Sequence, residues 1–194
     1  MNYLGHLYLS PPGEDALLGS LLGDFVKGPL DMDSGAALTQ AIALHRKLDV
    51  FTDAHCAVIA SRGRVSSARR RYAGIMIDMF YDHFLARYWA DFHNQPLDEF
   101  AARVYAILER RFDELPPRLQ QMAPFMIRGD WLASYAEVDS IASALDRIGT
   151  HLKRENRLSG SGAELLEHYG AFESDFRLFL PQAREFCRAF ARQR

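Results

Sequence analysis

Apolar residues recur at helical spacing along almost the whole chain, between short stretches that start or stop helices. After Pro11-Pro12-Gly13, two acidic residues open a run whose apolar members follow an i, i+3, i+4 pattern: Leu17, Leu18, Leu21, Leu22 and Phe25. No segment alternates apolar and polar residues between turn signals, so strands are expected to be few or absent. The pattern predicts an all-α fold, a single-domain helical bundle over residues 1–194.

Proline, glycine and capping residues divide this bundle into successive helices. The predicted helices run from Glu14 to Gly28, from a cap at Asp33 or Ser34 to Phe51, from Gly74 to Ala90, from Pro96 to a point before Pro116, and from a cap at Asp130 to near Gly149, with a last pair broken at Pro181.

Length and composition limit the class of protein. A chain of 194 residues that is 48% hydrophobic buries one substantial core, which excludes a disordered chain. No apolar run approaches 18 residues, and the first basic residue is Lys27, so neither a membrane helix nor a secretory signal is expected. Two cysteines, Cys56 and Cys187, make no disulfide framework, and a reducing cytoplasm is the expected location.

The distribution of charge says more than its sum. A net charge of −2 argues against general nucleic-acid binding. Between Asp53 and Asp78, however, there is no acidic residue, and this interval carries Arg62, Arg64, Arg69, Arg70 and Arg71. Such a local positive surface indicates an acidic partner or a phosphate, although a solvated basic loop and helix end would look the same.

A polar stripe borders the apolar face of the second predicted helix. Asp49 lies about 40° around the helix from His45, and Asp53 about 80° around it. Polar groups at the edge of a buried face need partners, since burying them unpaired costs several kcal/mol. A divalent metal or arginines are two candidates for that partner, and surface i, i+4 pairing is the plainer alternative.

Two carboxylates, Asp78 and Asp82, share the apolar face of the third predicted helix, and His83 follows directly. Aspartate is rarely buried without a partner, and both aspartate and histidine bind divalent metals. Because adjacent residues diverge by about 100°, a metal bound by Asp82 and His83 would lie over the helix edge. The alternative is a buried histidine that is bonded to a backbone carbonyl.

The third group lies near the start of the chain. His6 is in the segment Asn2-Tyr3-Leu4-Gly5-His6-Leu7, and Asp24 interrupts an apolar run, with Lys27 near enough to pair with it. Helical bundles commonly build metal sites from ligands that project inward from facing helices. Mixed imidazole and carboxylate ligands favour Mn²⁺, Fe²⁺, Zn²⁺ or Mg²⁺ over soft metals.

These residues fall into four short motifs that occur in order: Asn2-x-x-x-His6, Leu22-Gly23-Asp24-Phe25-Val26, His45-Arg46-x-x-Asp49-x-x-Thr52-Asp53 and Asp78-x-x-x-Asp82-His83-Phe84-Leu85. In this order, and with a C-terminal block from Glu167 to Phe176, the chain resembles the acyl carrier protein phosphodiesterase family. The resemblance covers nearly the whole chain. It implies an all-helical, HD-domain-like, Mn²⁺-dependent hydrolase of fatty acid biosynthesis.

The resemblance also implies the reaction, which is hydrolysis of the phosphodiester between 4′-phosphopantetheine and a serine of holo acyl carrier protein. We expect Asp24, His45, Asp82 and His83 to bind the metal, with His6 as a fifth ligand. Three carboxylates would orient ligands or activate water: Asp49, Asp53 and Asp78. Arg46 is expected to stabilise charge on the phosphoryl oxygens, because arginine binds them bidentately.

The five arginines from Arg62 to Arg71 are predicted to dock the carrier protein, which as a class presents a strongly acidic surface. Two alternative functions stay open. One is an HD-type enzyme for a small nucleotide or another phosphodiester, which needs no broad basic surface. The other is a helical interaction module without activity, which would carry no stoichiometric metal.

Overall fold

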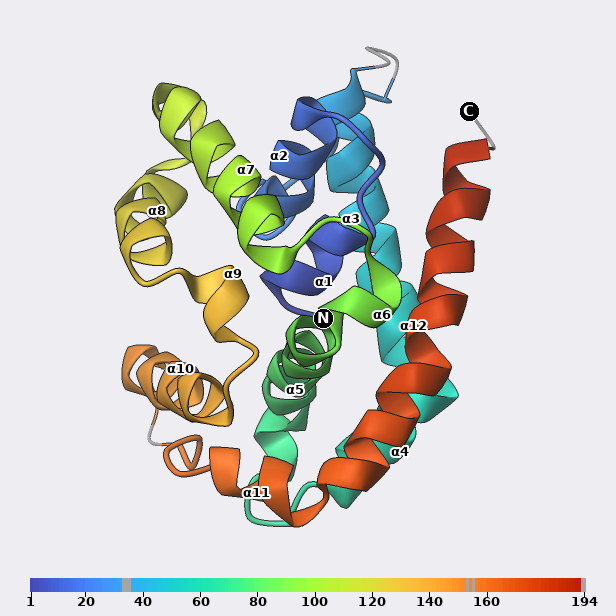
Figure 1. Ribbon diagram of the computed structural model, residues 1–194, viewed down its shortest axis with the longest axis vertical. Coiled ribbons are helices and arrows are strands. Elements are labelled where there is room, and N and C mark those ends of the chain that lie inside the picture. The colour runs from blue at the N-terminus through green and yellow to red at the C-terminus, as the bar shows by residue number, and fades with distance from the viewer. Residues whose placement is uncertain (33–35, 153, 155, 193–194) are drawn as a thin grey trace.

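The computed structural model describes residues 1–32, 36–152, 154 and 156–192, and every regular element within these residues is helical (Figure 1). The all-α prediction is therefore confirmed. The helices are α1 (Tyr3–Tyr8), α2 (Glu14–Leu22), α3 (Ala37–Ala54), α4 (Cys56–Arg64), η2 (Arg70–Tyr72), α5 (Ala73–Arg87), α6 (Trp89–Phe92), α7 (Leu97–Arg110), η3 (Phe112–Glu114), α8 (Pro117–Arg128), α9 (Trp131–Ser134), α10 (Val138–His151), α11 (Gly162–Glu167) and α12 (Tyr169–Arg192). The predicted caps Asp33 and Ser34 lie outside the described residues.

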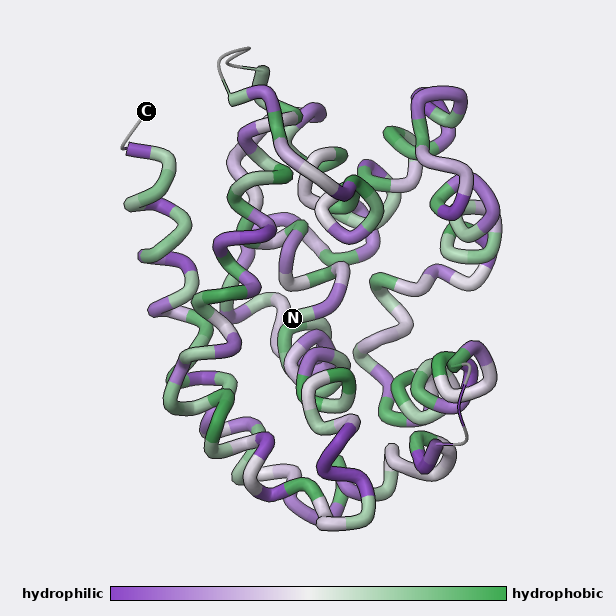
Figure 2. Tube along the Cα trace, turned by 180° about the vertical axis from the view of Figure 1, so that it is seen from behind, coloured by the Kyte–Doolittle hydropathy of each residue, from purple (hydrophilic) through white to green (hydrophobic). Residues whose placement is uncertain are grey.

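Helix α5 is the central element of the bundle. It packs against α1, α4, α10 and α12, and it buries most of its side chains. Figure 1 shows α12 along one side of the molecule, α7 to α10 along the other side, and the amino terminus beside α5. Hydrophilic and hydrophobic residues alternate within each turn of α12, as expected for a helix with one buried face (Figure 2). Buried hydrophobic residues from Met1 to Cys187 form one cluster.

Helix α2 ends earlier than predicted. It was expected to reach Gly28 but stops at Leu22. Beyond it, the carbonyls of Val26 and Gly28 accept hydrogen bonds from the two terminal nitrogens of Arg46, each at 2.8 Å, instead of continuing the helical ladder. The residues after α2 therefore form a loop tied to α3.

The helix predicted to start at Asp130 is divided into α9 and α10, so this prediction was wrong. Asp130 has a left-handed backbone, with φ of 41°, and its side chain caps nothing. Its carboxylate accepts a hydrogen bond from the hydroxyl of Tyr105 at 3.0 Å, and the amide of Leu132 donates to that hydroxyl at 2.9 Å. The Tyr105 hydroxyl thus provides a partner for one amide in the first turn of α9.

The predicted break at Pro181 is wrong, because α12 continues through this residue. A proline inside a helix removes one backbone hydrogen bond and strains the preceding turn. Here Phe179, Leu180 and Ala183 are all buried around it, so packing against the core holds the helix together. Among the described helices, none is both long enough and apolar enough to cross a bilayer.

Close packing of α2 on α3 depends on Gly19. A Cβ there would lie 2.5 Å from the Leu38 carbonyl oxygen and 2.7 Å from the Ala41 Cβ. We expect Gly19→Ala to lower the free energy of unfolding by about 1–3 kcal/mol, since two backbones must separate. Urea unfolding measures this change.

The control is Gly63→Ala in α4, where an added Cβ would meet nothing within 4 Å. That variant should gain up to about 1 kcal/mol from helix propensity. Equal stability of the two variants would contradict the importance of this contact.

Candidate metal centre

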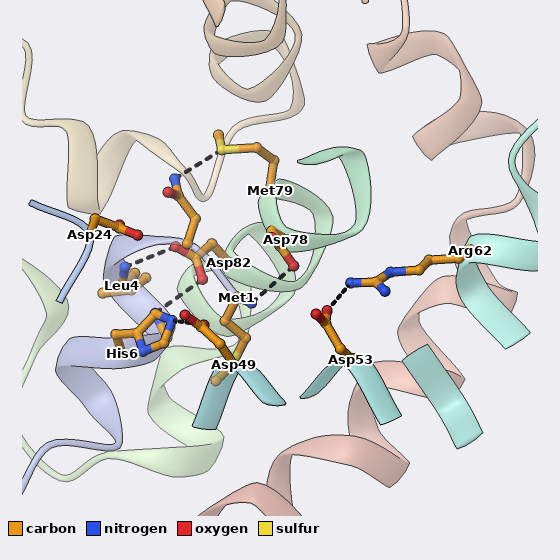
Figure 3. Close-up of polar contacts among 12 residues, drawn as sticks. Met1, Leu4, His6, Asp24, Asp49, Asp53, Arg62, Asp78, Met79 and Asp82 are labelled. Carbon is orange, nitrogen blue, oxygen red and sulfur yellow. Dashed lines mark hydrogen bonds and ion pairs between the residues drawn. The ribbon is translucent and has the colours of Figure 1, made fainter. Parts of the chain in front are cut away.

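Helix α1 is a six-residue helix that the apolar pattern did not predict, and a distant carboxylate holds its first turn. Asn2, at the N-cap, makes no side-chain cap. Instead the amides of Leu4 and Gly5 donate to the two oxygens of Asp82 on α5, at 2.8 and 3.0 Å (Figure 3). An anion is stabilised at a helix N-terminus, and it satisfies amides that have no partner within the helix. Asp82 therefore fixes the position of α1 and of His6, the residue after Gly5.

Two buried imidazoles face each other at the other side of α1. The rings of His6 and His45 stack with centroids 3.7 Å apart and planes inclined by 17°. His6 Nε2 lies 3.1 Å from one carboxylate oxygen of Asp49, and His45 Nε2 lies 3.3 Å from the other oxygen. His45 Nε2 is also 3.5 Å from a carboxylate oxygen of Asp24. We call these four residues the His-Asp cluster.

The protonation of His45 is fixed from the side away from the cluster. Its Nδ1 lies 2.7 Å from the carbonyl oxygen of Ser20, which can only accept, so Nδ1 carries a proton. Nε2 of the neutral ring then presents a lone pair to Asp24 and Asp49. Two carboxylates facing a lone pair repel it unless a positive charge, a proton or a metal ion, lies between them.

The pKa values in the cluster follow from this arrangement. Burial opposes a charge on His45, but hydrogen bonds to Asp24 and Asp49 outweigh it and raise the pKa of His45 to about 9. Burial also lowers the pKa of His6 and outweighs its hydrogen bond to Asp49. Against the effect of burial, the imidazoles hold the pKa of both carboxyl groups below the usual range. Without a metal, a proton on His45 Nε2, between the imidazole and the two carboxylates, is therefore favoured.

Gly23 makes room for the His45 ring. A Cβ at this position would lie 2.2 Å from Cγ of His45, so only glycine allows the ring to lie against the end of α2. The next residue is Asp24, at the start of the loop that Arg46 ties to α3. Gly23 and Arg46 thus bring Asp24 to His45 from the two ends of the loop.

The His-Asp cluster fits a divalent cation. Ligand atoms of His6, His45 and Asp49 all lie within 4.8 Å of one another. His6 is 4% exposed, and its Nδ1 has no hydrogen-bond partner among the residues that the structure describes. The carboxylates of Asp24 and Asp49 are about half exposed, at 50% and 46%, so the cluster is open to solvent on the carboxylate side. Nitrogen and oxygen donors of this kind suit Mn²⁺, Fe²⁺ and Zn²⁺.

Of the predicted metal ligands, the structure brings together His6, Asp24 and His45, and it adds Asp49, which was expected to play an orienting role. Asp82 is not among them, because both of its oxygens are bonded to the amides of α1. Burial raises the pKa of Asp82 to about 7, against the effect of these amides. Its place is behind the site, where it supports His6.

His83 points away from the cluster. Its Nδ1 lies 2.9 Å from the Tyr135 carbonyl oxygen and its Nε2 lies 2.9 Å from the Tyr169 hydroxyl, so both ring nitrogens have partners. This is the alternative considered above, a buried histidine bonded to a backbone carbonyl. His83 faces a separate pocket of about 320 Å³ beside Arg87 and Glu137.

Asp53 and Asp78 also lie outside the cluster. Asp53 is exposed and forms an ion pair with Arg62, directed away from His6 (Figure 3). Asp78 accepts a hydrogen bond from the amino group of Met1 at 2.9 Å. The guanidinium of Arg46, expected to contact a phosphoryl group, is bonded to the two loop carbonyls instead.

Most of the predicted arginine docking surface is engaged within the protein. Arg62 pairs with Asp53, Arg64 with Asp175, and Arg69 with Glu164. Arg69 also donates to two backbone carbonyls. Within the described chain, only Arg70 and Arg71 of the five are exposed without a carboxylate partner.

Sequence reasoning missed the Ser20 carbonyl, the contact between Gly23 and His45, and the role of Tyr3, whose hydroxyl reaches Met122 on α8. Gly23 carried a usable signal, because a glycine directly before a charged residue at a helix end indicates a close approach. The other two depend on tertiary packing.

Comparison with known proteins gives one consistent family. Residues 1–183 match the family Acyl carrier protein phosphodiesterase. Proteins of that name from Photorhabdus laumondii subsp. laumondii, Serratia proteamaculans and Klebsiella pneumoniae are 34%, 36% and 33% identical to this chain. The matches cover 95%, 94% and 94% of this chain and 94%, 95% and 95% of those proteins. No solved structure matches, so likeness to HD domains stays a prediction.

The contact at Gly23 generates a prediction about metal affinity. Gly23→Ala should displace the His45 ring and weaken binding of Mn²⁺ by at least about tenfold, because one of the predicted ligands loses its orientation. Isothermal titration with Mn²⁺ measures this affinity, and Gly63→Ala serves as the control. Unchanged affinity in Gly23→Ala would show that the ring position is not needed.

The Asp82→Asn variant tests whether Asp82 holds α1 in place or binds the metal directly. The asparagine oxygen can accept from one α1 amide but leaves the other unsatisfied, which should cost about 1–3 kcal/mol in the free energy of unfolding. The Asp82→Asn variant should still bind one equivalent of Mn²⁺, with an affinity reduced by about 10–100-fold. Asp49→Asn, which changes a member of the cluster, should instead lose Mn²⁺ binding. A folded Asp82→Asn protein that binds no cation would make Asp82 a ligand after all.

Proposed function

The chain belongs to the acyl carrier protein phosphodiesterase family, and we propose that its His-Asp cluster binds the divalent cation with which it hydrolyses holo acyl carrier protein. The reaction releases 4′-phosphopantetheine and leaves apo acyl carrier protein. One observation carries the assignment of the site. His45 Nε2 presents its lone pair to the carboxylates of Asp24 and Asp49, at 3.5 and 3.3 Å, so the cluster needs a positive charge at that point.

The proposed ligands are His6, Asp24, His45 and Asp49, and the proposed cation is Mn²⁺. When bound, such a cation lowers the pKa of a water molecule and polarises a phosphoryl oxygen. His45 Nδ1 keeps its proton and donates a hydrogen bond to the Ser20 carbonyl, which leaves Nε2 free to bind the cation. Burial of both rings keeps water away from the imidazole side, while the half-exposed carboxylates leave the other side open to substrate.

The reaction places further demands on the chain. Water must attack phosphorus, and the bond that breaks joins phosphorus to the serine oxygen of the carrier protein, which gains a proton. Only the open side of the cluster, beside Asp24 and Asp49, can admit a phosphodiester that is attached to a folded protein. Arg46 acts in this proposal as a positioning residue, because it holds the loop that begins at Asp24.

The proposed location is the cytoplasm. Both cysteines are free thiols, which is consistent with a reducing compartment, with Cys56 exposed and Cys187 buried. The carrier protein is the proposed macromolecular partner, and its prosthetic group is the part that enters the cluster.

The test is incubation of the protein with holo acyl carrier protein and Mn²⁺, followed by intact mass of the carrier protein. We expect loss of the phosphopantetheine mass with the wild-type protein. His45→Ala and Asp49→Ala should lower kcat/KM by more than about 100-fold, because loss of a metal ligand exceeds the 10–100-fold effect of an outer residue.

Asp53→Ala is the matched control, since Asp53 is a carboxylate one helical turn from Asp49 that pairs with Arg62 outside the cluster. It should retain activity within about threefold, the effect of a surface ion pair. No mass loss with any divalent cation would overturn the proposed function, and equal activity of all variants would overturn the site.

A further inference from the structure

We propose that the exposed face of α8 is the surface on which the acyl carrier protein docks, an inference that rests on the proposed function. The scissile phosphodiester is attached directly to a serine of the carrier protein. The protein surface around that serine must therefore lie against the rim of the His-Asp cluster. A docking surface has to adjoin the exposed side of Asp24 and Asp49.

Helix α8 adjoins that side through two contacts. The Tyr3 hydroxyl, at the start of α1, lies 3.7 Å from the sulfur of Met122 on α8. The guanidinium carbon of Arg118 lies 6.0 Å from the centre of the Phe25 ring, and Phe25 follows Asp24 directly. Arg118 is exposed, so its positive charge is available to a partner at the edge of the cluster.

Charge on α8 is positive and uncompensated. From Leu115 to Gly129 the sequence contains no acidic residue, and it carries Arg118 and Arg128. Within the part of the chain that the structure describes, neither arginine pairs with a carboxylate, and Arg128 lies over the Phe125 ring at 5.0 Å. The nearest acids in sequence are engaged, Glu114 with Arg111 and Asp130 with Tyr105.

An exposed aromatic side chain lies between the two arginines in the sequence of α8. Phe125 is 60% exposed on α8, seven residues or about 10 Å along the helix from Arg118. Beyond the end of α8, Trp131 packs over Gly129, and Arg147 of α10 lies over its ring at 5.4 Å. Arginine and aromatic residues of this kind supply most of the binding energy at protein interfaces.

These features select an acidic protein as the occupant. A small phosphodiester needs only the cluster, whereas exposed arginines and an aromatic residue spread along a helix fit a folded partner with a negative surface. The carrier protein is such a partner, so docking on α8 would place its serine-linked arm at Asp24.

The segment from Arg62 to Arg71 fits this role less well. Three of its arginines are neutralised by Asp53, Asp175 and Glu164. Arg70 and Arg71 precede α5, whose first residue, Ala73, lies nine residues and about 14 Å along the axis from Asp82. A carrier protein docked there would hold its serine far from the cluster.

The experiment compares two charge reversals of equal size. Arg118→Glu/Arg128→Glu changes α8, and Arg70→Glu/Arg71→Glu is the matched control on the other surface. For each protein, fluorescence anisotropy gives the Kd for labelled holo acyl carrier protein without added cation. Titration gives the Mn²⁺ affinity, and intact mass gives turnover.

We expect the α8 variant to raise Kd and KM by about tenfold or more at low salt, with kcat and Mn²⁺ affinity nearly unchanged. Wild-type Kd should rise with ionic strength, and the α8 variant should lose most of this dependence. Phe125→Ser should raise Kd without changing the salt dependence. The control should stay within about twofold of wild type.

A Kd that is unchanged in the α8 variant, or that rises only in the Arg70/Arg71 variant, would overturn the docking proposal while leaving the enzymatic proposal standing. If the wild-type protein binds the carrier protein but releases no phosphopantetheine, the enzymatic proposal is overturned and the docking proposal stands.

Discussion

The carboxylate of Asp82 holds helix α1 in place, and the candidate site depends on that contact. A six-residue helix has too few internal hydrogen bonds to be stable alone. Two of its free amides are satisfied by a fully buried carboxylate from the central helix, so the core itself caps α1. His6 is thereby held against His45, and two elements far apart in sequence supply one pair of imidazoles.

Around that pair, polar groups are divided between a fixed side and an open side. On the fixed side, the Ser20 carbonyl determines the tautomer of His45, and Gly23 allows the ring to approach the backbone. On the open side, Asp24 and Asp49 are half exposed. The imidazole nitrogens of the cluster are therefore shielded from solvent, while its carboxylate oxygens are accessible.

The sequence allowed prediction of the parts that local geometry determines. His45 and Asp49 are four residues apart on one helix, so their shared face followed from helical periodicity. Asp82 and His83 were misplaced because a buried polar residue on an apolar face can bind a metal, cap another helix or bond to a carbonyl. Only the packing of α1 and of the Tyr135 carbonyl against α5 distinguishes these outcomes. Helix α1 is too short to show a period, so its position could not be predicted.

The capping of α1 by Asp82 also has a consequence for biosynthesis. Asp82 lies 78 residues beyond Leu4 in the sequence, so the ribosome makes α1 long before it makes the group that holds it. Until α5 has emerged and packed, the contact that holds α1 and His6 beside His45 is missing, so the proposed cation site lacks one of its two imidazoles. The proposed cation site is therefore completed late in the maturation of this protein, after the core has formed.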